Sequence, residues 1–344
     1  MQSLRAMRRE YTALIDETFD EIIPRAEQEI AKAYHDASEA WTREMIEAHE
    51  QAGQEIPWVR LPVADANELV TETVQGHEVG QSFFKADPKR LEIIAKDVRR
   101  DMDRARYATI ERSGAQYKEI LMNADAYVQT GTMTPLDAVE KASQECADQG
   151  LNAVRYENGN IVNVASYVDM ALRTSAHRAV LTAEGSKREE WGFPLVISPA
   201  LHSTCDICLK WQGRILIDDV YAQIEPDKAE GVKENHERLS TAVKEGFIHP
   251  NCRHPLVTYV EGITQIPTKS PHDKTRRQYN AEQKQRSIER GIRRWKRRQA
   301  IAEGEQELRM ATAKVKEWQA RMRDHLDKNP QLRRNPKREK LMVG

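Results

Sequence analysis

The chain has 344 residues, of which 31% are charged and 39% hydrophobic, which is typical of a helix-rich protein with two or three domains and modest cores. No run of apolar residues is long enough to span a bilayer, and the start of the chain lacks the apolar segment of a signal peptide. We therefore expect synthesis in a reducing cytosol and no membrane partner, so the four cysteines indicate metal ligands or core positions rather than disulfides.

The net charge of −1 hides an uneven distribution of charge along the chain. Residues 274–344 contain 22 Lys and Arg against 9 Asp and Glu, a net charge of +13, so residues 1–273 carry −14. Such a basic segment indicates a polyanion or an acidic protein surface as its partner. The simpler alternative is a solvated basic helix.

The first predicted element is a long helix over residues 5–50, where apolar side chains recur every three or four residues. Pro24 is expected to kink this helix or to divide it. Prolines predict an extended break over residues 53–62. A second helix over about residues 63–73 and a loop over residues 76–80 follow.

Asp87 and Pro88 form a strong helix start, because Asp is a capping residue and Pro fits the first turn. Asn158 and Gly159 predict a short hairpin over residues 156–164. Glycines or a Ser-Gly pair end the helices of this region, which are predicted over residues 88–112, 115–130, 134–150 and 166–183.

After residue 185 the pattern changes to short β-like runs bounded by Gly, Pro and Asp, at residues 195–198, 214–217 and 256–260. They predict a small α+β domain of about 80 residues, a size at which a structural metal supports a marginal core.

The C-terminal part is predicted to be a linker over residues 267–271 and a helix over residues 278–325 with an apolar stripe. Residues 329–344 contain prolines and no periodicity, so we expect them to be mobile until bound. The predicted fold class is mostly α with a small α+β domain. Its three parts are a helical docking or oligomerisation region (1–185), a compact Cys/His α+β module (186–268) and a basic helical tail with a mobile end (269–344).

Three of the four cysteines lie in two short segments, Cys205-Asp-Ile-Cys208 and His249-Pro-Asn-Cys252-Arg-His254. Thiolates and imidazoles that converge from two loops form the donor set of a tetrahedral Zn²⁺ site. The predicted structural Zn²⁺ ligands are Cys205, Cys208, Cys252 and His254, with His249 as the alternative fourth ligand. The remaining interpretations are free thiols in a core, or a thiol pair that oxidises outside the cell.

These segments belong to a longer pattern. In chain order, this pattern consists of Tyr156-Glu-Asn-Gly159, Trp211-Gln-Gly-Arg214, Asn251-Cys-Arg-His254 and a basic helix that contains Arg293-Arg-Trp-Lys-Arg-Arg298. Over about residues 115–300 this order resembles the phage minor capsid protein 2 family, a group of phage minor head proteins. The complete C-x2-C pair departs from many members of that family, so the resemblance does not carry a metal role to these cysteines.

The resemblance implies a structural minor capsid protein of a tailed bacteriophage, assembled in the host cytoplasm into the virion at or near the portal. Portal or major capsid protein would be its partner, and we expect multiple copies per virion. The alternatives are a free DNA-binding protein and a metal-stabilised nucleic-acid-processing enzyme with a ribonuclease-like fold. An enzyme would draw on His249, His254, Arg253 and Arg214. Without an acidic metal cluster or a phosphate-binding glycine loop in the sequence, no catalytic residue is predicted.

The arginine-rich turn near residue 295 covers nearly every face of its helix. Guanidinium charge without base readout favours phosphate contacts, so packaged double-stranded DNA is an expected partner. An acidic portal or capsid surface and the acidic body of the same chain are the alternatives. The predicted contact residues are Arg290, Arg293, Arg294, Lys296, Arg297 and Arg298.

Overall fold

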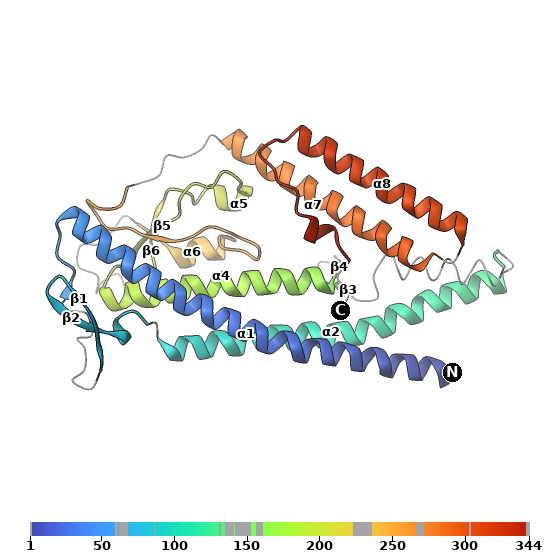
Figure 1. Cartoon of the computed structure of the whole chain (residues 1–344), viewed down its shortest axis with the longest axis horizontal. Helices are drawn as coiled ribbons and strands as arrows, with labels where there is room; N and C mark the ends of the chain where they lie inside the picture. Colours follow the sequence, from blue (N-terminus) through green and yellow to red (C-terminus); the bar gives the residue numbers. More distant parts are fainter. Residues whose placement is uncertain are drawn as a thin grey trace. The chain divides into compact units, whose positions relative to one another are not determined.

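The computed structural model describes residues 2–58, 61, 68–85, 87–130, 132–134, 141, 153–155, 161–222, 236–265, 272–302 and 304–341. This part of the chain is mostly helical and carries short hairpins and a four-stranded sheet (Figure 1), which confirms the predicted fold class. None of its helices combines the length and the apolar character needed to cross a membrane.

The contacts within the chain divide it into two compact units. The terminal unit consists of Met1–Glu21, Met102–Asp169 and Arg277–Gly344, and the central unit of Ile22–Asp101 and Met170–Arg276. The division into three parts at residues 185 and 268 stays a prediction.

Helix α1 (Gln2–Ala52) is continuous. Pro24 therefore does not divide it, which was one of the two outcomes expected for this proline. Pro24 lies on the exposed face, where water can bond the carbonyl that loses its helical N–H partner. Ile30, Tyr34 and Trp41 recur at helical spacing and are buried in the central unit.

The chain then forms a hairpin where we had expected a helix and a loop. Strand β1 (Val70–Val74) pairs antiparallel with β2 (His77–Gly80), and a short 3-10 turn, η2 (Gln81–Phe83), follows. Gln75 and Gly76 both have positive φ, 45° and 83°, which is the geometry of a tight two-residue hairpin turn. The prediction for residues 70–80 was therefore wrong, and residues 62–67 lie outside the described part.

Helix α2 (Pro88–Gln129) begins as predicted, with Asp87 Oδ1 accepting a hydrogen bond from the Lys89 N–H at 2.8 Å. It runs through Ser113 and Gly114, where two separate helices had been predicted. A glycine inside a helix costs only about 1 kcal/mol, which does not by itself end the helix. The helix predicted over residues 134–150 lies almost wholly outside the described residues.

Strands β3 (Ala153–Arg155) and β4 (Ile161–Asn163) pair antiparallel, as the predicted hairpin requires, and its turn lies outside the described residues. Helix α4 (Val164–Trp191) starts before Ser166 and continues beyond Gly185, which had been predicted to close it. A Cβ atom on Gly185 would lie 2.4 Å from Tyr221 Cβ, so this glycine permits close packing rather than ending the helix.

The predicted α+β module is built on the sheet β7-β6-β5-β8. Strand β5 (Leu195–Ile197) pairs antiparallel with β6 (Ile215–Ile217) and β8 (Val257–Thr258), and β6 pairs parallel with β7 (Glu237–Arg238). The short helices are α5 (Asp206–Leu209) and α6 (Leu239–Lys244). The core cluster of the module includes Leu181, Val196, Leu216, Leu239, Phe247 and Leu256.

The basic C-terminal region is a helical hairpin rather than one helix. Helices α7 (His272–Ile301) and α8 (Glu305–Asp327) are separated at Gly304, whose extended backbone begins α8. Ile288, Ile292 and Met322 form the core of this hairpin. Beyond α8, residues 329–341 pack instead of lacking structure: they include the 3-10 turn η4 (Pro336–Glu339), and Leu332 is buried.

Candidate metal centre and basic surface

The first pair of thiols lies on one helical turn. Cys205 is the N-cap of α5, with extended backbone at φ −74° and ψ 160°, and its carbonyl accepts from the Leu209 N–H at 3.1 Å. Cys208 lies within α5, fully buried, whereas Cys205 is half-buried. Cys205 at the N-cap and Cys208 three residues later can therefore bind one metal ion from the same side.

The second donor segment is the tight loop between α6 and β8. Ile248 and Asn251 have left-handed backbone, with φ of 55° and 66°, and the Cys252 N–H donates to the His249 carbonyl at 2.8 Å. Because β8 pairs with β5, the sheet brings this loop to the segment that carries α5.

Five donor atoms meet there as two overlapping triads. Cys208 Sγ lies 3.8 Å from Cys252 Sγ, which lies 3.2 Å from His254 Nδ1, and Cys205 Sγ lies 3.1 Å from His249 Nε2. Within the triads Cys205–Cys208–His249 and Cys208–Cys252–His254, all donor atoms lie within 4.8 Å of one another. Metal bonds of about 2.0–2.3 Å fit such separations, so this donor set suits Zn²⁺.

The surroundings lower the pKa of two of the three thiols, Cys205 and Cys252, and so favour their thiolate form, which is the form that binds metal. The contact with Cys208 lowers the pKa of Cys252 to about 3, against the effect of burial and with help from the ring and backbone of His254. The same contact and burial raise the pKa of Cys208. Burial opposes ionisation of Cys205, but the Cys208 backbone N–H and the His249 ring outweigh it and lower the pKa of Cys205.

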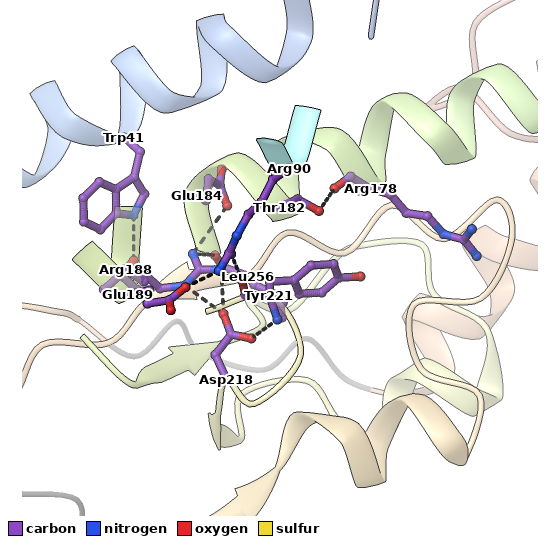
Figure 2. Close-up of polar contacts among 11 residues, drawn as sticks. Trp41, Arg90, Arg178, Thr182, Glu184, Arg188, Glu189, Asp218, Tyr221 and Leu256 are labelled. Carbon is purple, nitrogen blue, oxygen red and sulfur yellow. Dashed lines mark hydrogen bonds and ion pairs between the residues drawn. The ribbon is translucent and has the colours of Figure 1, made fainter. Parts of the chain in front are cut away.

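A buried polar cluster attaches α4 to the sheet of the module (Figure 2). The Arg188 guanidinium points at Asp218, with Nε 3.0 Å and Nη2 2.9 Å from Oδ2, and both side chains are fully buried. Glu184 Oε2 lies 3.7 Å from Arg188 Nη1. Arg90 donates to the Tyr221 carbonyl at 2.6 Å. These contacts fix the strand ends of the sheet that carries the two donor segments.

Three of the four residues on which a nuclease would draw contact other groups in the structure. His254 is 3% exposed and points at Cys252, and Arg214 pairs with Glu237 at 2.8 Å. His249 Nε2 faces Cys205, while Arg253 is exposed. The two imidazoles thus face thiols as metal ligands would, and the four residues, as the structure describes them, do not join a general base and a phosphate clamp in one cleft.

The predicted nucleic-acid residues on α7 divide into two groups. Arg293 Nη1 donates to the Arg338 carbonyl, and Lys296 Nζ donates to the Glu339 carbonyl at 2.9 Å, so both hold the C-terminal segment. The other four lie together on one face by helical spacing and form what we call the basic stripe: Arg290, Arg294, Arg297 and Arg298. Arg290 and Arg294 are exposed, and Arg298 stacks over the Trp295 ring at 4.9 Å.

The polar side chains behind the candidate metal centre were not predicted from the sequence. Gln212 and Thr204 contact the His254 ring, and His177 Nε2 lies 3.1 Å from the His254 carbonyl. In the sequence, Trp211-Gln-Gly-Arg214 was identified only as part of a longer motif, and no contact of Gln212 was predicted. The signal that could have identified Gln212 is its place as a polar residue between a tryptophan and a glycine.

The chain is similar in sequence to structural proteins of phages. Residues 2–327 match the model of a family described as phage minor capsid protein 2. The chain is 24% identical over 242 residues to a "Structural protein" of Lactococcus phage LL-H, covering 66% of this chain and 62% of that protein. It is 35% identical over 101 residues to a "Structural protein" of Lactococcus phage mv4, covering 28% and 81% respectively. No solved structure matches the chain.

Proposed function

Because the chain belongs to the phage minor capsid protein 2 family, we propose that it is a minor head component at or near the portal whose basic stripe contacts packaged double-stranded DNA. As a phage structural protein it is a component of the virion, which implies capsid-related partners. In this proposal the long helices α1 and α2 dock on the portal or the major capsid protein, and several copies enter each virion.

The observation that carries the DNA contact is the basic stripe. Four arginines share one face of α7, while the opposite face buries Ile288 and Ile292 against α8. Guanidinium groups along one helix face neutralise phosphates without reading bases, so the expected binding is independent of sequence and weakens steeply with salt.

The Cys/His module has a structural role in this proposal. Zn²⁺ would be held by Cys205, Cys208 and Cys252 with His254 or His249, and would join α5 to the loop before β8. No catalytic role is proposed, since His254 is buried and Arg214 is paired. A nucleic-acid-processing enzyme therefore has less support than a virion component.

The test of the DNA contact compares two variants of the full chain that lose the same charge. Replacing Arg290, Arg294, Arg297 and Arg298 by Gln should weaken binding to duplex DNA and reduce the slope of log K against log salt by roughly 0.9 for each phosphate that is no longer neutralised. The control replaces four exposed cations of α8 and its C-cap by Gln: Arg309, Lys316, Arg323 and Lys328. Equal losses in both variants, or no DNA binding by the unaltered chain, would contradict the proposal.

A further inference from the structure

The buried side of the candidate metal centre contains an amide that faces a histidine ring. The Gln212 side-chain nitrogen lies 2.9 Å from His254 Nε2 and 2.6 Å from Thr204 Oγ1. Gln212, Thr204 and His254 are each 3% exposed, so water does not compete for these contacts. Thr204 Oγ1 also lies 3.4 Å from His254 Nε2, so each of the three side chains contacts the other two.

The ring nitrogens of His254 thus face different surroundings. Nε2 faces Gln212 and Thr204, and Nδ1 faces Cys252 Sγ at 3.2 Å. To ligate a metal through Nδ1, the imidazole must keep a lone pair on Nδ1 and carry its proton on Nε2, and that proton needs a buried acceptor. A rotation of the Gln212 amide by half a turn brings its oxygen to the same place, and this oxygen can accept from both Nε2–H and the Thr204 hydroxyl.

His249 is held in the opposite sense. Its Nδ1 lies 2.7 Å from the Pro250 carbonyl, so Nδ1 carries the proton and Nε2 presents its lone pair toward Cys205. This anchor is a backbone carbonyl of the adjacent residue in a partly exposed loop, whereas the anchor of His254 is buried and comes from the Trp211-Gln-Gly213 turn.

We infer that Gln212 is the positioning residue that selects His254 as a metal ligand through Nδ1. This inference rests on the proposed metal centre and assigns its fourth ligand. It also gives the Trp211-Gln-Gly213 turn a function: Trp211 packs in the core of the module, and Gly213 donates to the Ser198 carbonyl at 2.7 Å, so the turn fixes Gln212 between them.

The experiment uses the full chain, freed of metal and titrated with Co²⁺, whose visible bands and thiolate charge-transfer band report the ligand set. Gln212→Leu removes the acceptor and should lower Co²⁺ and Zn²⁺ affinity about 10- to 100-fold, with visible bands shifted to those of His254→Ala. Gln212→Glu keeps an acceptor and should retain both the affinity and the spectrum. Gln285→Leu deletes a buried amide of the terminal unit and should change neither.

A second measurement is independent of affinity. In the Zn²⁺-loaded chain, nitrogen-detected NMR of the His254 ring should show the proton on Nε2 and the metal on Nδ1. The inference is overturned if Gln212→Leu keeps the unaltered spectrum and affinity, if Gln212→Glu loses as much as Gln212→Leu, or if His254 ligates through Nε2. An unaltered chain that takes up neither Co²⁺ nor Zn²⁺ overturns the metal centre itself, and the DNA test is unaffected by that outcome.

Discussion

Cys208 and Cys252, buried with their sulfur atoms 3.8 Å apart, cannot both ionise at low cost unless a cation lies between them. In the metal-free chain one thiol keeps its proton, as the raised pKa of Cys208 and the lowered pKa of Cys252 describe. A divalent ion would replace that proton, so metal binding and folding of the module are linked. An ion at a thousand times its Kd adds about 4 kcal/mol to the free energy of unfolding.

Metal removal should therefore destabilise the central unit. We expect about one zinc per chain by elemental analysis, and chelation or Cys252→Ser should lower the unfolding temperature of that unit measured by calorimetry. Cys146→Ser is the matched control, because Cys146 is the one cysteine that lies outside the two Cys/His segments of the sequence. Protein prepared without chelator that contains no metal, or a Cys252→Ser chain that melts like the unaltered one, would argue against the metal centre.

Glu184 should make the stability of the central unit depend on pH. Burial raises the pKa of Glu184 to about 7 despite the nearby Arg188, with Glu44 and Asp218 adding to the rise. The folded state then binds more protons than the unfolded state between about pH 4.5 and 7, so the free energy of unfolding falls as pH rises through this window. Glu184→Gln removes this titration. Between pH 5 and pH 8 the free energy of unfolding of the unaltered chain should therefore fall by about 2 to 3 kcal/mol more than that of Glu184→Gln, measured by denaturant unfolding. Parallel profiles for the two chains would contradict this.

The residues of the metal centre were predictable because the thiols and imidazoles lie close together in two short segments, with spacings typical of metal ligands. The partners of those residues were not predictable in the same way. Gln212 contacts His254 across 42 positions, and Arg188 contacts Asp218 across 30. Such pairs exist only after the sheet has formed, so the buried charges near the end of α4 could not be identified from local sequence.

Two glycines inside helices have packing roles rather than capping roles. A Cβ atom on Gly185 would lie 2.4 Å from Tyr221 Cβ, and one on Gly291 would lie 2.3 Å from Trp318 Cε3. The sequence suggested a helix end at Gly185 because glycine commonly follows a helix. Local propensity cannot distinguish a glycine that ends a helix from one that lets a neighbour approach, whereas the β5, β6 and β8 strands were predictable from their apolar runs.

The close approach of α7 and α8 predicts a specific cost for a methyl group. Gly291→Ala should destabilise the terminal unit by about 1 to 3 kcal/mol in chemical unfolding, because the added carbon meets the Trp318 ring and this outweighs the better helix propensity of Ala. Adding Trp318→Leu should recover part of the loss. Gly304→Ala is the control, since its Cβ would meet nothing within 4 Å. A Gly291→Ala chain as stable as the unaltered one would show that the helices separate without cost.

The basic hairpin formed by α7 and α8 is not a detachable tail. The terminal unit combines α7 and α8 with the start of α1 and the latter part of α2. Deleting residues 274–344 would therefore remove part of a compact unit together with the charge. The acidic and basic halves were evident from composition, but the joining of distant segments into one unit depends on long-range packing that composition does not encode. Changes of charge on the basic stripe of α7 are accordingly the cleaner test.

The partner of the hairpin can be decided in assembled heads. If the basic stripe binds DNA, a chain with Gln at Arg290, Arg294, Arg297 and Arg298 should enter DNA-free heads at the copy number of the unaltered chain, because its docking through other surfaces is intact. In DNA-filled heads the same chain should be released at lower salt than the α8 control, since fewer phosphates are neutralised. Quantitative mass spectrometry of purified heads measures both values. A deficit already present in DNA-free heads would identify an acidic portal or capsid surface as the target, because no phosphate is available there to account for the arginines.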